Sequence, residues 1–268
     1  FINEAIKESK PDVYIGAQDI WGLEPSIKRD WFDKVTSAIW TTLDSLPLYP
    51  NAIKAAKKIK NFWVWSSFAE KEFNRLGIKG VKTVHGALSP ENFCKLPDEA
   101  KSTLRKRFNI EEDAFIIGFV FRNQLRKSVP NLIEGYAKWK ETCKPNKKTY
   151  LLLHTSWKEG WNIHRLCEEY DIPKDEVITT HICKNCKNFY VKPYEGEGKT
   201  CEICSKEKSQ NTCNVSLGVE EAQLNEIYNL MSVYCHPFTS GGQEIPVQEV
   251  SEDESEREDV QEATNETE

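Results

Sequence analysis

The sequence lacks the features that direct a chain into a membrane, into export or into a repeat architecture. Its apolar runs fall short of the roughly 18 residues that a membrane-spanning helix needs, so we expect no such helix. The first ten residues follow a polar helical pattern rather than that of a signal peptide, and no repeat of solenoid length occurs. Met231 is the sole methionine and the chain begins at Phe1, so we expect a processed chain or a fragment.

Acidic residues outnumber basic ones only slightly, 42 to 36, and the formal net charge is −6. The acidic excess lies at the end of the sequence, where residues 251–268 contain nine acidic residues and only Arg257. That segment carries −8 and leaves +2 for the remainder. Because it has almost no apolar residues, we predict a disordered acidic tail over 251–268. The near-neutral body gives no general reason to expect nucleic-acid binding.

Short apolar segments alternate with helical patterns along the rest of the chain. Such a rhythm is typical of parallel sheets with helices on their faces. It predicts an α/β fold with two Rossmann-like parallel-sheet units. The predicted strands are 11–17, 62–66, 81–84, 115–121, 150–154, 175–180 and 233–236, and the predicted helices are 67–76, 98–108, 130–139, 162–170 and 220–230.

Four of the nine cysteines form two CxxC pairs, and 14 residues separate the pairs. Each pair places two thiolates on a tight knuckle, and two facing knuckles complete a tetrahedral Zn–S4 site. We therefore predict a zinc ribbon over 183–204, with Cys183, Cys186, Cys201 and Cys204 as ligands. Four protein ligands leave no position for water, so this zinc is structural. The alternative is that these cysteines are free or disulfide-paired.

The role of the ribbon stays open at this point. It is either a stapled surface insertion or a docking element for an acceptor or partner. The other five cysteines are scattered, and the paired ones have metal-binding spacing, so we expect a reducing, cytoplasmic compartment.

A basic loop follows the apolar strand at 115–121. The run FIIGFVFRNQLRK places Arg122 at the end of that strand and Lys127 five residues later. Loops at the carboxyl edge of a parallel sheet face the ligand crevice. Two cations there are suited to a diphosphate, Arg122 as a fork and Lys127 as a point charge. The alternative is a solvated basic turn.

The spacing G-x3-R-x4-K, followed by VPNLIEGYAKW (129–139), resembles the start of the C-terminal domain in retaining group 1 glycosyltransferases. These enzymes have the GT-B fold and use nucleotide-diphosphate sugars. The resemblance implies that Arg122 and Lys127 hold the donor diphosphate and take part in catalysis. It also implies that no catalytic metal is needed.

A second match covers VEEAQLNEIYNL (219–230) and SVYCHPFTSGGQEIPVQE (232–249), which resemble the helix, strand and donor loop of the same family. The family shows Glu-x7-Glu in this loop. The second position is Glu249, to which the resemblance assigns binding of the nucleotide ribose. The first falls on Gly241, a departure that leaves the backbone of Gly241, Gly242 and Gln243 to meet the sugar or phosphate.

The resemblance divides the chain into parts. Residues 1–93 are similar to the second half of the N-terminal, acceptor-side domain, and 94–250 to an incomplete C-terminal nucleotide-sugar-binding domain. The ribbon at 183–204 interrupts the latter. The expected function is therefore transfer of a sugar from a nucleotide-diphosphate donor to a glycan, lipid or protein acceptor, with retention of configuration.

Two other functions fit the same residues. One is a non-catalytic binding module built on the zinc ribbon, and the other is a degenerate domain that binds a nucleotide sugar without turnover. His154 ends a predicted strand and faces the expected crevice, so it is a candidate donor contact, with core packing as the alternative.

Overall fold

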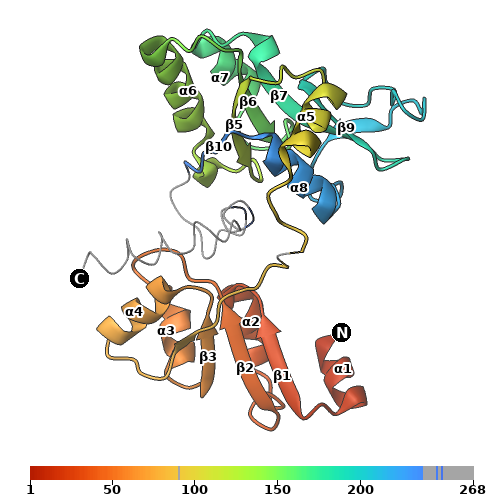
Figure 1. Cartoon of the computed structure of the whole chain (residues 1–268). Helices are drawn as coiled ribbons and strands as arrows, with labels where there is room; N and C mark the ends of the chain where they lie inside the picture. The colour runs from red at the N-terminus through yellow and green to blue at the C-terminus, as the bar shows by residue number, and fades with distance from the viewer. Residues whose placement is uncertain (90, 238–245, 247–248, 250–268) are drawn as a thin grey trace. The chain divides into compact units, whose positions relative to one another are not determined.

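The computed structural model describes residues 1–89, 91–237, 246 and 249. These residues form two compact units, one comprising Phe1–Ala87 and one that begins at Leu88. Each unit is an α/β arrangement with its own core, as Figure 1 shows. Among the described residues, no helix is both long and apolar enough to cross a membrane.

The first unit is built on a four-stranded parallel sheet with the order β1-β2-β3-β4. Its elements are α1 (Ile2–Ser9), β1 (Val13–Ala17), α2 (Ile20–Ile27), β2 (Thr36–Thr41), α3 (Pro50–Ala56), β3 (Asn61–Val64), α4 (Ser67–Arg75) and β4 (Lys82–Thr83).

The core of the first unit lies on one face of this sheet. Phe62 and Val64 alternate along β3 and are fully buried, because their side chains point to the face on which Ile20 of α2 and Phe73 of α4 pack. The edge strand β1 is different, since both Val13 and Ile15 are 54% exposed. One edge of the sheet therefore shows apolar side chains to solvent.

The second unit contains a six-stranded mixed sheet with the order β10-β5-β6-β7-β8, and β9 also pairs with β7. The first four strands of that order are parallel, whereas β8 and β9 run antiparallel to β7. The elements are α5 (Asp98–Arg107), β5 (Phe115–Val120), η1 (Leu125–Lys127), α6 (Val129–Cys143), β6 (Thr149–His154), α7 (Ile163–Glu169), η2 (Lys174–Glu176), β7 (Val177–Cys183), β8 (Phe189–Pro193), β9 (Gln210–Thr212), α8 (Glu221–Leu230) and β10 (Val233–Tyr234).

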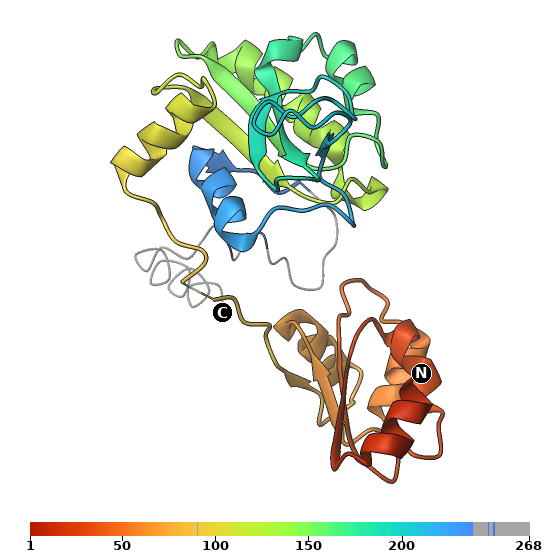
Figure 2. The same ribbon diagram turned by 90° about the vertical axis from the view of Figure 1, so that its right-hand side faces the viewer.

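Strand β6 is the centre of the second core, and all six of its residues are buried. Leu151 and Leu153 point toward the α6 and α7 side of the sheet, while Tyr150 and Leu152 point toward α5 and α8. Helices cover both faces, as Figures 1 and 2 show. A strand buried on both faces reads as a continuous apolar run, which is why the sequence pattern located β5 and β6.

The prediction of an α/β fold with two Rossmann-like units is confirmed, and so is the insertion of a four-cysteine cluster in the region of the second sheet. The predicted strand 175–180 is displaced, because β7 continues to Cys183. Its antiparallel partners β8 and β9 hold the extra residues in the sheet, and their pairing is long-range information that the local pattern does not carry.

Candidate functional site

The loop after β5 places two cations in different surroundings. The Arg122 side chain is 58% exposed, and its Nε lies 3.7 Å from Oε2 of Glu159. Lys127 is only 7% exposed and ends η1, immediately before α6. Both residues lie at the carboxyl end of a parallel strand, the edge at which open α/β sheets bind ligands.

Asn123 holds this loop in place, and sequence analysis did not single it out. Its side chain is buried, and its Nδ2 donates to the carbonyl oxygens of Ser156 (3.1 Å) and Trp161 (3.0 Å). The Trp161 N–H donates back to Asn123 Oδ1 at 2.9 Å. The loop that carries the cations is thus fastened to the loop that follows β6.

Gly160 makes that close approach possible. It has a φ of +62°, and a Cβ built on it would lie 2.2 Å from the backbone oxygen of Asn123. Any other residue would therefore push the two loops apart. The only local sign of this arrangement is the glycine itself, in a loop of otherwise bulky residues.

His236 lies close to Lys127. Burial, together with the smaller effect of the positive charge of Lys127, lowers the pKa of His236 to about 4. The imidazole is consequently neutral at neutral pH. It packs edge-on against Phe119, with ring centroids 5.4 Å apart. Because His236 follows β10, the ends of β5 and β10 bring these side chains to one edge of the sheet.

Glu249 lies against α8. The Tyr228 hydroxyl donates to its Oε2 at 2.5 Å. Burial raises the pKa of the Glu249 carboxyl, although the Tyr228 hydrogen bond opposes the shift. Gly241, Gly242 and Gln243 lie outside the described residues.

A series of aromatic rings connects Glu249 to the surroundings of Lys127. Tyr228 packs on Tyr234 with centroids 5.9 Å apart, and Tyr234 packs on His236 at 5.5 Å. The Tyr234 hydroxyl also donates to the carbonyl oxygen of Val120 at 3.2 Å. The described contacts therefore link Glu249 and Lys127 along the ends of β5 and β10.

His154 is held by a different partner. It ends β6 and is buried, and its Nδ1 lies 3.0 Å from Thr180 Oγ1. Burial lowers the pKa of His154 to about 4, so the ring is neutral at neutral pH. Strand alternation places its side chain on the same face of the sheet as Tyr150 and Leu152, the face that α5 and α8 cover.

The four ribbon cysteines converge on one point. Their Sγ atoms all lie within 4.8 Å of one another, and the pairs Cys183–Cys204 and Cys186–Cys201 are each 3.7 Å apart. A tetrahedral site with Zn–S bonds of about 2.3 Å has sulfur–sulfur distances of about 3.8 Å. The geometry and the all-thiol donor set therefore fit a structural zinc ion.

The surroundings of Cys183 also suit a metal-bound thiolate. Burial opposes ionisation, but the contact with Ser209 and the backbone N–H groups of Cys186 and Asn185 lower the pKa of the Cys183 thiol to about 6. The two N–H groups lie 3.4 and 3.3 Å from Sγ. Donors arranged around a sulfur atom orient the ligand and tune its charge.

The ribbon is continuous with the sheet. Cys183 is the last residue of β7, and the antiparallel β8 and β9 lie on either side of that strand. Glu197 accepts a hydrogen bond from the backbone N–H of Thr212 at 2.8 Å, which ties the segment between the knuckles to β9. Trp157 stacks on Tyr194 at 4.4 Å. The ribbon is thus packed against the loop after β6.

Comparison with known proteins gives relatives in structure alone. No protein-family profile and no curated protein matches the sequence. The structure is similar to that of HepE from Anabaena, solved in complex with UDP and glucose, with a TM-score of 0.62 and 12% identity over 93% of this chain. It is also similar to a glycosyltransferase from Rickettsia africae, with a TM-score of 0.50 and 14% identity over 66% of this chain.

These likenesses establish the fold. The chain has a GT-B-like α/β fold with a four-cysteine cluster in the region of its second sheet. It spans 59% of the Anabaena chain and 48% of the Rickettsia chain.

Proposed function

We propose that this chain is part of a retaining glycosyltransferase that uses a nucleotide-diphosphate sugar. The observation that carries the proposal is the buried Lys127 in the loop after β5. Lys127 lies close to His236, and the rings of His236, Tyr234 and Tyr228 lead from there to the carboxylate of Glu249. The GT-B-like fold supports it, because the similar Anabaena protein was solved with UDP and glucose.

The residues have the following roles in this proposal. Lys127 and Arg122 bind the donor diphosphate and stabilise the negative charge that grows on it as the bond to the anomeric carbon breaks. Glu249 accepts hydrogen bonds from the ribose, as the family resemblance implies. Gly241, Gly242 and Gln243 offer backbone N–H groups to the sugar or phosphate, and His154 is a further candidate donor contact.

Burial makes Lys127 the more effective of the two cations. A charge held at a site with little water acts through a lower effective dielectric constant than an exposed one. Its position is also fixed before the donor arrives, so little reorganisation is needed during the reaction. Arg122 has an exposed side chain, and its pairing with Glu159 must give way for it to reach a diphosphate.

The metal in this proposal is structural. Zinc at the four cysteines would hold the ribbon against the sheet, and the cations that act on the diphosphate are side chains. Four thiols that must stay reduced to bind a metal favour a reducing compartment such as the cytoplasm. The acceptor is a glycan, lipid or protein, and nucleic acid is not proposed as a partner.

Donor binding can be tested on this chain by thermal shift with UDP-glucose, GDP-mannose and ADP-glucose. A donor that binds the folded state raises the melting temperature. We expect one of them to do so, and the shift to be lost in Lys127→Met. The matched control is Lys138→Met, which removes an exposed lysine that pairs with Glu134 on α6.

Sugar transfer is tested with the full-length protein. NMR follows both the release of the nucleotide and the anomeric configuration of the product. Retention is expected. Donor binding without turnover in the full-length protein would favour the degenerate binding domain instead. Absence of any donor shift, together with a salt-dependent affinity for nucleic acid, would favour a ribbon-based binding module.

A further inference from the structure

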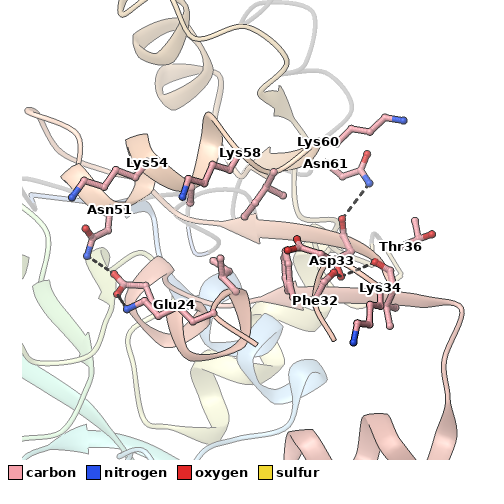
Figure 3. A pocket seen from close by; sticks show the side chains of 16 residues that line it. Glu24, Phe32, Asp33, Lys34, Thr36, Asn51, Lys54, Lys58, Lys60 and Asn61 are labelled. Atoms are coloured by element: carbon pink, nitrogen blue, oxygen red, sulfur yellow. Dashed lines mark hydrogen bonds and ion pairs between the residues drawn. The ribbon is translucent and has the colours of Figure 1, made fainter. Parts of the chain in front are cut away.

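The first unit contains a hollow whose lining residues all belong to that unit and none of which is a candidate-site residue. It lies between α2 and α3, beside the residues that begin β2 and β3, and has a volume of about 1000 Å³ (Figure 3). Thr36, Ser37 and Asn61 line it at the amino ends of these strands. In open α/β sheets the substrate crevice is at the carboxyl ends, so this hollow is a separate feature of the sheet.

Lysine dominates the lining of the hollow. Five lysines contribute to it, whereas Glu24 and Asp33 are the acidic residues of the lining. Glu24 is already engaged, because it accepts hydrogen bonds from Asn51 (2.8 Å) and Lys28 (3.3 Å), and these bonds lower the pKa of its carboxyl. The lysines are Lys28, Lys34, Lys54, Lys58 and Lys60.

The lysines follow the local structure. Asn51, Lys54 and Lys58 are spaced three and four residues apart, so they lie along one side of α3 and its end. Figure 3 shows Lys54 and Lys58 on one side of the hollow and Glu24 on the opposite side. Apolar side chains, among them Phe32 and Ile59, also line the hollow.

We propose that this hollow binds a soluble ligand that carries two or more phosphate groups. Each of these lysines is exposed, and a single exposed ion pair contributes at most about 1 kcal/mol. Only an anion that meets several of them at once can be held. The volume exceeds that of an inorganic ion, and the apolar part of the lining suits the organic body of such a ligand.

The proposal can be tested by isothermal titration of the full chain with sodium tripolyphosphate at a constant ionic strength of about 0.15 M, where screening is physiological. The test variant is Lys34→Gln/Lys54→Gln/Lys58→Gln. The control is Lys71→Gln/Lys79→Gln/Lys82→Gln, which removes the same charge from exposed positions of the same unit outside the hollow. Circular dichroism verifies that both variants are folded.

We expect the wild type and the control to bind tripolyphosphate equally, and the test variant to bind at least about tenfold more weakly. Equal loss in both variants would show non-specific charge attraction and would overturn the proposal. The proposal would also be overturned if the protein bound phosphatidic acid vesicles through the same lysines but did not bind tripolyphosphate. The phosphate recognised by the hollow would then be that of a lipid headgroup.

Discussion

At the scale of single residues, Asn123 acts on the candidate donor site without belonging to its charged groups. Its buried side chain joins the loop after β5 to the loop after β6 through three hydrogen bonds. Replacing it with alanine leaves buried backbone groups of Ser156 and Trp161 without their partner. Such a loss costs about 1–3 kcal/mol of stability.

We therefore expect Asn123→Ala to lower the free energy of unfolding by about 2 kcal/mol and to weaken donor binding at the same time. Urea denaturation and thermal shift with the sugar nucleotide measure the two effects. The matched control is Asn146→Ala, at an exposed position of the second unit between α6 and β6. Donor affinity that is unchanged in Asn123→Ala would show that the contact does not position the cations.

Gly160→Ala probes the same contact from the other side. The added methyl group would meet the Asn123 backbone, and the positive φ disfavours alanine. We expect a loss of 1 kcal/mol or more, of the order seen for overpacked sites. Gly135→Ala on α6 is the control, because a Cβ there has no neighbour within 4 Å; equal stability of the two variants would contradict the prediction.

His154 makes stability depend on pH. Its pKa is about 4 in the folded protein and about 6.5 when unfolded, so the unfolded state binds a proton more readily. Stability is complete above pH 6.5 and is lost as the pH falls toward 4. By linkage the loss at pH 5 is about 2 kcal/mol.

Urea denaturation at pH 7.5 and 5.0 measures this effect. His154→Gln removes the titrating group and should reduce the difference between the two pH values by about 2 kcal/mol. The matched control is His164→Gln, a substitution of the same kind at an exposed position of α7. An undiminished difference in His154→Gln would show that other groups control acid stability.

At the scale of elements, a zinc ion held by the four cysteines would tie the end of β7 to the segment between β8 and β9. We expect removal of zinc by a chelator to lower the melting temperature of the second unit and to release β8 and β9 first. Cys201→Ser should reproduce the effect without a chelator, whereas Cys143→Ser, at an exposed position at the end of α6, should not. Zinc content by atomic absorption gives one ion per chain if the site is occupied as expected.

The elements also show what sequence can and cannot reveal. Apolar runs located β5 and β6, because a strand buried on both faces has apolar side chains at most successive positions. They missed β2, whose pattern mixes exposed Thr36 with buried Ile39, and they missed β9, which is only three residues long. Strand β9 is held in the sheet by its pairing with β7, where Thr212 lies opposite His181, and such long-range pairing leaves no local pattern in the sequence.

In the candidate site, too, the sequence predicted some features and not others. The spacing of the two CxxC pairs predicted that the four cysteines lie together, because a tetrahedral metal site takes two ligands from each pair. Burial of Lys127 and its closeness to His236 were not foreseen, since the loop after β5 and the end of β10 lie about a hundred residues apart. The role of Asn123 depends on a second loop in the same manner.

At the scale of the whole molecule, two units with separate cores should respond separately to ligands. Differential scanning calorimetry is expected to show two transitions. A sugar nucleotide and zinc should raise the one that belongs to the second unit, and tripolyphosphate the one that belongs to the first. A single transition that every ligand raises equally would mean that the units unfold together.

Strand β7 has one more consequence. Because β7 carries both Thr180, beside His154, and Cys183 of the four-cysteine cluster, we expect zinc binding by that cluster and packing of the interior to stabilise each other. A substitution that weakens packing of the interior should therefore also lower the affinity of the four-cysteine cluster for zinc. Leu152 pairs with Ile178 in the neighbouring strand and is not one of the four cysteines. We expect the variant Leu152→Ala to lose zinc to a competing chelator more readily than the wild type does.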